Sequence, residues 1–175
     1  MRLVVTGRRK DGKSVFVTDR EVPGRTLKSF ADMTNVDVWG SDDIPVRVAS
    51  GERPEYVRFF PPEGGFRVQL FTAPPDSVVE SARADHEQMV EELQSVLPGW
   101  LEDAHPDPDD PRFHATDTVD VGICVGGQAQ LELDDGATAV LRPGDVYVQN
   151  GTRHRWSNTG DEPFQMLVFL VGLRR

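Results

Sequence analysis

The sequence contains little cysteine, few aromatic residues and no long hydrophobic run. Cys124 is the single cysteine among 175 residues, so no intramolecular disulfide can form. The N-terminal residues MRLVVTGRRK lack the apolar stretch of a secretory signal, and no run is long enough to span a membrane. These absences predict a soluble, cytoplasmic protein without a membrane partner.

Positive charge is also scarce. The chain has 19 Lys and Arg against 29 Asp and Glu, which gives a formal net charge of −10. Because an acidic surface repels phosphate backbones, we expect no nucleic-acid partner. Much of the acid lies in residues 76–92 and in the run from Glu102 to Asp110. We interpret these as a solvated face and a solvated loop.

Turn-forming residues are abundant, with 16 Gly and 13 Pro, and the hydrophobic content is 38%. A chain of 1–175 with this composition predicts one all-β domain. Within 1–75 we expect a hairpin over 2–22 and a strand over Phe66–Phe71. Prolines interrupt the apolar pieces between them, where edge strands and loops are expected; the pieces are Val36–Trp39 and Val46–Val48.

The hydrophobic period changes in the segment 76–99. Apolar positions recur at steps of three and four, which predicts an amphipathic helix over about 77–97. Ser77 and Glu80 form a possible capping box, with Asp76 as an alternative N-cap. The apolar stripe consists of Val78, Val79, Ala82, His86, Met89, Val90, Leu93 and Leu97.

His86 lies on this stripe and is expected to be half-buried. After the helix, residues 100–113 are rich in Pro and Asp and lack periodicity. This connector predicts either a lid or a surface loop, with His105 exposed.

Short strands follow one another closely in 114–172. Asp135-Gly136 is the strongest hairpin signal, and further turns are expected at Pro143-Gly144-Asp145 and Asn150-Gly151. Such spacing predicts a sandwich or a small barrel. The expected strands are Val119–Val125, Ala129–Leu133, Ala137–Leu141, Val146–Gln149, Arg153–Ser157 and Phe164–Val171.

Side chains alternate between the two faces of a strand, so parity predicts which residues share a face. One face collects His114, Asp120 and His154, whereas Val119 and its alternate neighbours form an aliphatic face. The polar face predicts a barrel interior that holds a small-molecule ligand. The aliphatic face needs a cover from the helix, the N-terminal strands or a second subunit, and we expect a homodimer.

The spacing of these residues resembles the two motifs of the cupin superfamily. In the first motif, G-x5-H-x-H-x3,4-E-x6-G, His114 matches the first histidine and Gly127 the closing glycine. Thr116 stands in place of the second histidine and Asp120 in place of the glutamate.

The second cupin motif, G-x5-P-x-G-x2-H-x3-N, is matched by Gly151, His154 and Asn158. Gly144 opens it one residue short of the usual spacing. The resemblance implies a cupin double-stranded β-helix, a jelly-roll barrel, with N-terminal strands and one inserted helix.

Cupins typically bind a divalent metal through histidines and a carboxylate. Carried over by position, the resemblance implies His114, Asp120 and His154 as metal ligands, for Zn, Fe, Mn or Ni. Asp117 is the competing carboxylate. Its parity points it away from His114, but a β-bulge between them would reverse this.

Five further residues are candidates for ligand binding. Thr116 would occupy the vacant ligand position, and Trp156 and Tyr147 would form pocket walls, although core packing is an alternative for both. Gln149 would orient a ligand or satisfy turn backbone. Cys124 would lie near the metal or act as a small buried hydrophobe.

The resemblance implies a metal-dependent small-molecule enzyme. We expect a decarboxylase, dehydratase or isomerase that acts on an oxygenated metabolite. Three alternatives stay open: a non-catalytic metabolite-binding or sensing cupin, an Fe-dependent dioxygenase and a structural cupin without metal.

Overall fold

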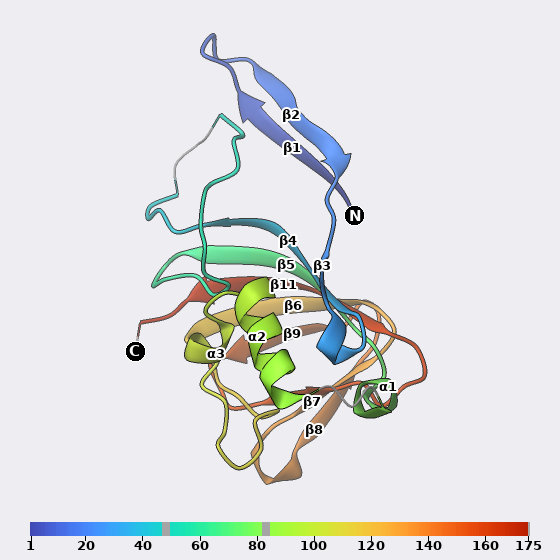
Figure 1. Cartoon of the computed structure of the whole chain (residues 1–175). Helices are drawn as coiled ribbons and strands as arrows, with labels where there is room; N and C mark the ends of the chain where they lie inside the picture. The colour runs from blue at the N-terminus through green and yellow to red at the C-terminus, as the bar shows by residue number, and fades with distance from the viewer. Residues whose placement is uncertain (47–49, 82–84, 175) are drawn as a thin grey trace.

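The chain folds mainly into antiparallel β-sheets (Figure 1). This computed structural model describes residues 1–46, 50–81 and 85–174. The predicted pieces at Val46–Val48 and Ala82 therefore lie partly or wholly outside the described residues. The strands are β1 Arg2–Arg8, β2 Ser14–Glu21, β3 Arg25–Leu27, β4 Met33–Ser41, β5 Phe66–Ala73, β6 Thr118–Gly126, β7 Ala129–Glu132, β8 Thr138–Leu141, β9 Val146–Asn150, β10 Arg155–Ser157 and β11 Phe164–Gly172.

Two sheets form the body of the protein. The larger has the order β3-β4-β5-β11-β6-β9, and the smaller has the order β10-β7-β8. All their paired strands are antiparallel. This arrangement confirms the all-β barrel that the strand and turn pattern predicts.

The predicted N-terminal hairpin is confirmed as β1 and β2, which pair only with each other among the described strands. Figure 1 shows the hairpin standing away from the body and joined to it through β3. Its contact with the body includes Gly7, where an added Cβ would meet the backbone of Ser50.

The turn at Asp135-Gly136 is also confirmed. It joins β7 to β8 through the short 3-10 turn η2, Asp134–Gly136. Asp135 and Gly136 have φ values of 57° and 73°, in the left-handed region that such tight hairpin turns require. Asp and Gly adopt this conformation at low cost.

The large sheet buries its polar face. In β5 the side chains of Arg67 and Gln69 are 0% and 5% exposed, whereas Phe66 and Val68 on the opposite face are partly exposed. Arg67 pairs with Leu170 of β11 across the sheet. The barrel interior is thus lined in large part by polar groups, as the parity of the motif-bearing strands predicts.

The helical segment differs from the prediction of one continuous helix over 77–97. The described residues contain α1 Asp76–Ser81 and α2 His86–Val96 instead. Asp85 has φ −69° and ψ 141°, an extended conformation that a helix cannot pass through. The prediction that His86 is half-buried is wrong, because it lies exposed in the first turn of α2.

The connector includes α3 Trp100–Asp103, and its later residues contact the barrel. Arg153 contacts the Phe113 ring with its guanidinium carbon 4.1 Å from the ring centroid. The same guanidinium forms a 2.8 Å ion pair with Asp107. Asp110 pairs with Arg155. Part of the acidic run thus forms structural ion pairs, and is not wholly a solvated loop.

In residues 1–46, 50–81 and 85–174, no helix is long and apolar enough to span a membrane.

Candidate functional site

Strand β6 supplies one wall of the barrel interior. Thr118, Asp120 and Cys124 are 1%, 7% and 0% exposed, whereas Val121 and Val125 on the other face are 42% and 45% exposed. Successive residues of a strand face opposite sides, so the alternation in the sequence produces this division directly. The predicted polar interior face of β6 agrees with the structure.

Strand β9 supplies the adjoining wall. Asp120 pairs with Gln149, and Gly122 pairs with Tyr147. Gln149 is 2% exposed, whereas Val146 and Val148 are 61% and 57% exposed. Tyr147 therefore shares the inner face with Gln149, a point that the sequence left open.

The Tyr147 ring lies directly over Gly122. A Cβ added to Gly122 would stand 2.7 Å from the Tyr147 hydroxyl oxygen, so only glycine leaves room for the ring there. The ring also packs edge to face against Trp156, with centroids 4.9 Å apart. Tyr147 and Trp156 both border the hydrophobic cluster around Phe164. The two aromatic rings thus form part of the barrel wall and also pack against the core.

The two motif histidines lie together. The rings of His114 and His154 have centroids 4.4 Å apart. Their backbones exchange two hydrogen bonds, each 2.9 Å long, in an isolated antiparallel bridge. Trp100 lies beside His114 at 5.6 Å, and Trp156 lies beside His154 at 6.3 Å between ring centroids. Two segments forty residues apart in the sequence are therefore held at one point.

Backbone carbonyls set the tautomer of both histidines. Nδ1 of His114 lies 3.2 Å from the carbonyl oxygen of Arg112, and Nδ1 of His154 lies 2.9 Å from that of Thr152. A carbonyl oxygen only accepts, so each Nδ1 carries the proton and donates. Each neutral ring therefore has its lone pair on Nε2, the atom available to a ligand, a proton or a metal.

Burial lowers the pKa of both histidines. The pKa of His154 is lowered to about 4, by desolvation as the larger cause and by the neighbouring His114 as the smaller one. Desolvation also lowers the pKa of His114, with an opposing contribution from the Arg112 carbonyl. A buried cation loses its hydration, so both rings are expected to be neutral at pH 7.

Asp120 shows the opposite effect of the same burial. Desolvation raises its pKa to about 6, although a hydrogen bond from Thr118 opposes the shift. Its Oδ1 is buried and has no hydrogen-bond partner among the described residues. The carboxylate also raises the pKa of the Tyr147 hydroxyl, after desolvation as the larger cause. A buried oxygen of this kind is poised to meet a ligand.

Thr116, Gln149 and Cys124 have other contacts. The Thr116 hydroxyl lies 2.8 Å from that of Thr118, and Thr116 is 3% exposed. The Gln149 amide donates to the Thr152 carbonyl at 2.9 Å, which favours the turn-satisfying role. Cys124 belongs to a hydrophobic cluster with Met166, as a small buried hydrophobe does.

The competing carboxylate, Asp117, contacts a different histidine. Its Oδ2 lies 3.2 Å from Nε2 of His105, and both side chains are 43% exposed. His105 is exposed, as expected. The pair joins the connector to the segment that precedes β6.

The donor atoms fit a divalent metal in part. Two imidazole Nε2 atoms with backbone-bonded Nδ1 groups are typical metal ligands. Among the described residues, however, no three His, Cys, Asp or Glu side chains come together as a group that would hold a metal. The three-ligand set of His114, Asp120 and His154 therefore stays a prediction.

Sequence reasoning missed two features of this site. Trp100, beside His114, lies in a connector without periodicity, so no local pattern signals its contact. The packing of the Tyr147 ring over Gly122 depends on the register between β6 and β9, which a single sequence does not specify. Its only signal is a glycine inside a strand, which often marks a close approach.

Comparison with known proteins identifies the class. Residues 93–170 match the family described as Cupin_2, cupin domain. These residues form a cupin domain, and the barrel is the all-β cupin barrel that the two motifs imply.

Two curated fungal proteins are similar in sequence. The chain is 29% identical over 171 residues to the cupin-domain-containing oxidoreductase fogC of Aspergillus ruber, covering 95% of this chain and 70% of that protein. It is 37% identical over 69 residues to Oryzines biosynthesis cluster protein J of Aspergillus oryzae, covering 39% of this chain and 38% of that protein. The match thus spans less than half of the latter protein's length.

A solved structure, the Schizosaccharomyces pombe Cnp3 cupin domain, superposes with a TM-score of 0.49 and 8% identity. The superposition covers 98% of this chain and 87% of that chain.

Proposed function

We propose that this cupin is a small-molecule enzyme of a biosynthetic pathway that catalyses an isomerisation or dehydration of an oxygenated metabolite. The similarity to a biosynthesis cluster protein supports a biosynthetic role, and the similarity to a cupin-domain-containing oxidoreductase supports an enzyme. The observation that carries the proposal is the buried Oδ1 of Asp120, which has no hydrogen-bond partner among the described residues, in a barrel that also holds the His114–His154 pair. An acid and a base within one enclosed lining are what proton transfer requires.

The residues have distinct roles in this proposal. Nε2 of His154 accepts a proton from a carbon of the substrate, because its ring is neutral and its Nδ1 is already engaged. Asp120 in its protonated form delivers a proton to the substrate. In dehydration that proton goes to a departing hydroxyl, which leaves as water; in isomerisation it goes to a second carbon or to a carbonyl oxygen. A pKa of about 6 suits this exchange near neutral pH.

The aromatic residues connect the two groups. The charge of Asp120 raises the pKa of Tyr147, and the Tyr147 ring packs on Trp156. Trp156 in turn lies beside His154. Such a wall would orient a flat or partly unsaturated substrate and exclude water from it.

We also propose that the site can bind a divalent metal: Zn, Fe, Mn or Ni. His114 and His154 would be its protein ligands through Nε2. A bound metal would supply Lewis-acid polarisation of a substrate oxygen. The proton transfers above belong to the site without a metal, because an Nε2 atom of His154 that binds a metal has no lone pair left to accept a proton.

The main alternative is a non-catalytic cupin that binds or senses a metabolite. The same enclosed polar lining would hold a ligand without turning it over. An Fe-dependent dioxygenase is a further alternative, since two histidines are part of the ligand set for such iron.

Incubation with metabolite extracts in D2O separates these functions. An enzyme that transfers protons introduces solvent deuterium into its substrate or product, which mass spectrometry detects. We expect labelling with the parent protein and its loss in Asp120→Asn and His154→Gln, with labelling retained in the exposed control His105→Gln. Ligand capture without labelling would favour the sensing cupin, and labelling retained in Asp120→Asn would contradict the assigned roles.

We also propose a homodimer, formed through the outer face of the large sheet. Cross-strand pairing places Val68, Phe169, Val121 and Val148 in one row. Phe169, Val121 and Val148 are 40%, 42% and 57% exposed, and β9 lies at the sheet edge. An apolar row that reaches a free edge suits contact with the same row of a second copy.

A further inference from the structure

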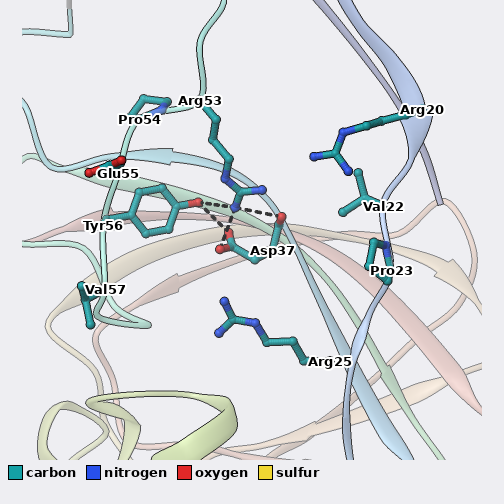
Figure 2. Close-up of a pocket in the computed structure, with 10 residues that line it drawn as sticks. All are labelled: Arg20, Val22, Pro23, Arg25, Asp37, Arg53, Pro54, Glu55, Tyr56 and Val57. Atoms are coloured by element: carbon teal, nitrogen blue, oxygen red, sulfur yellow. Dashed lines mark hydrogen bonds and ion pairs between the residues drawn. The ribbon is translucent and has the colours of Figure 1, made fainter.

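A cleft lies outside the barrel site. It has a volume of about 710 Å³ and opens between the end of β2, β3, β4 and the segment at residues 53–57. Figure 2 shows its lining: Arg20, Val22, Pro23, Arg25, Asp37, Arg53, Pro54, Glu55, Tyr56 and Val57. Nothing in the proposed barrel chemistry uses this cleft.

Three guanidinium groups from separate segments face the same space. Arg20 comes from β2, Arg25 from β3 and Arg53 from the loop that precedes β5. In Figure 2, Arg20 and Arg25 extend from one side of the cleft and Arg53 from the other. Two carboxylates, Asp37 and Glu55, also line the cleft, and Asp37 pairs with Arg53. The three cations therefore exceed the two anions, and the excess positive charge favours an anionic ligand.

The position of Arg53 is fixed by Asp37 and Tyr56. Arg53 forms a 2.7 Å ion pair with Asp37 Oδ2 and donates to the Tyr56 hydroxyl at 3.0 Å. Tyr56 in turn donates to Asp37 Oδ1 at 2.6 Å. Burial and Asp37 raise the pKa of Tyr56 to about 12, so the phenol stays protonated. Both oxygens of Asp37 are thereby engaged.

The Tyr56 ring is a rigid wall of the cleft. The guanidinium carbon of Arg67 lies 3.8 Å from the ring centroid. The Arg67 side chain is 1% exposed and forms a 2.6 Å ion pair with Asp42. A phenol stacked on a buried cation has little freedom to move.

The other two arginines retain donors for a ligand. Nη1 of Arg25 donates to the Val96 carbonyl at 2.9 Å, at the C-terminal end of α2, which positions the side chain. Within the described part of the chain, neither Arg20 nor Arg25 forms an ion pair with a carboxylate. Their remaining N–H groups suit the oxygens of a carboxylate or phosphate.

We propose that this cleft binds a small organic anion through Arg20, Arg25 and Arg53, with a carboxylate or phosphate group as the recognised chemistry. The protein has a formal net charge of −10, so its surface as a whole repels anions. The three arginines of the cleft provide a local region that attracts anions. The ligand lies where the hairpin joins the body, so binding would also tie β2 and β3 to the loop at Arg53.

The test uses calorimetric titration of the full chain with citrate, inorganic phosphate and glycerol as probes. We expect citrate or phosphate to bind and glycerol not to bind. Removal of two charge-assisted contacts in Arg20→Gln/Arg25→Gln should weaken binding about 10-fold or more. Binding to citrate alone would identify a carboxylate ligand, and binding to phosphate alone a phosphate ligand.

The matched control is Arg8→Gln/Arg9→Gln, which removes the same charge from the tip of the same hairpin. It should bind the anion as the parent does. The proposal is overturned if neither anion binds, if glycerol binds equally well, or if the two double variants lose affinity to the same extent. Circular dichroism and melting temperature establish that each variant is folded.

Discussion

The rings of His114 and His154 lie with centroids 4.4 Å apart and planes tilted by 51°, while their backbones exchange two hydrogen bonds of 2.9 Å. The bridge joins the end of the connector to the segment that leads into β10. Because each Nδ1 donates to a carbonyl, the two Nε2 atoms are the groups left for chemistry. A proton on one ring would repel a proton on the other, which favours a neutral pair.

Stability should depend on pH through two opposing groups. The folded pKa of Asp120, about 6, lies above its ordinary 3.8, so its contribution is present at low pH and lost as pH rises through 6. The folded pKa of His154, about 4, lies below its ordinary 6.5, so its contribution is present above 6.5 and lost as pH falls through 4. Each contribution is about 3 kcal/mol, and they offset one another between pH 4 and 6.

Urea denaturation across this pH range separates the two contributions. In Asp120→Asn the free energy of unfolding should rise with pH from 4 to 6.5, because only the histidine contribution remains. In His154→Gln it should fall over pH 4 to 6. Parallel pH profiles for the parent and both variants would contradict the opposing shifts.

Gly122→Ala should disturb the barrel wall. The new Cβ would stand 2.7 Å from the Tyr147 hydroxyl oxygen, so the ring must move. We expect a loss of about 1–3 kcal/mol in unfolding free energy. Gly126→Ala is the control, because its Cβ would meet only the flexible Gln165 side chain, with the amide oxygen nearest at 3.2 Å. Equal melting temperatures for the two variants would show that Tyr147 does not occupy this position.

Metal content distinguishes two ligand sets. The described residues bring His114 and His154 together but do not gather Asp120 into a group of three. After incubation with Zn²⁺ and desalting, we expect His114→Ala and His154→Ala to lose bound metal and Asp120→Asn to retain it. Mass spectrometry of the metal gives the stoichiometry. Loss of metal in Asp120→Asn would instead support the three-ligand set that the cupin motifs imply.

The connector should loosen when Arg153 is removed. Arg153 pairs with Asp107 and Asp134 and lies on the Phe113 ring. Arg153→Ala loses all of these contacts, and we expect faster amide exchange across residues 104–113 together with a loss of about 1–2 kcal/mol. The control Arg112→Ala removes a 68% exposed side chain and should change little. Unchanged exchange in Arg153→Ala would show that the connector is held by other contacts.

A charge placed on the apolar row should prevent dimer formation. Val148→Lys puts an ammonium group at a 57% exposed position of the edge strand β9, where it would have to be desolvated at the proposed interface. Sedimentation velocity should show a dimer for the parent and a monomer for the variant. Val17→Lys on the hairpin is the control and should stay dimeric. A monomeric parent at all concentrations would refute the proposed dimer.

Local alternation made the barrel lining predictable. The faces of β6 follow from a period of two residues, which needs no tertiary information, and Thr118, Asp120 and Cys124 are buried accordingly. The turn at Asp135-Gly136 is similarly local, because its chemistry selects positive φ values. These features confirm the fold class and the motif-bearing strands.

The remaining features depend on contacts distant in sequence. The helical period continues through His86, so periodicity alone does not reveal the extended Asp85 that separates α1 from α2. The Tyr147 position depends on its pairing with Gly122. The arginine cleft brings together Arg20 and Arg53, which are far apart in the sequence with β3 and β4 between them, so no short-range pattern indicates it.

The barrel holds a buried carboxyl at Asp120 and a histidine pair that we expect to be neutral. The most direct measurement follows the protonation of these three side chains by NMR, with 15N-labelled histidine and 13C-labelled aspartate, assigned through Asp120→Asn, His114→Gln and His154→Gln. We predict that Asp120 titrates near 6 and that both histidines are neutral Nδ1–H tautomers at pH 7, with His154 titrating near 4. Titration of Asp120 near 4 together with charged histidines near pH 6 would contradict the account.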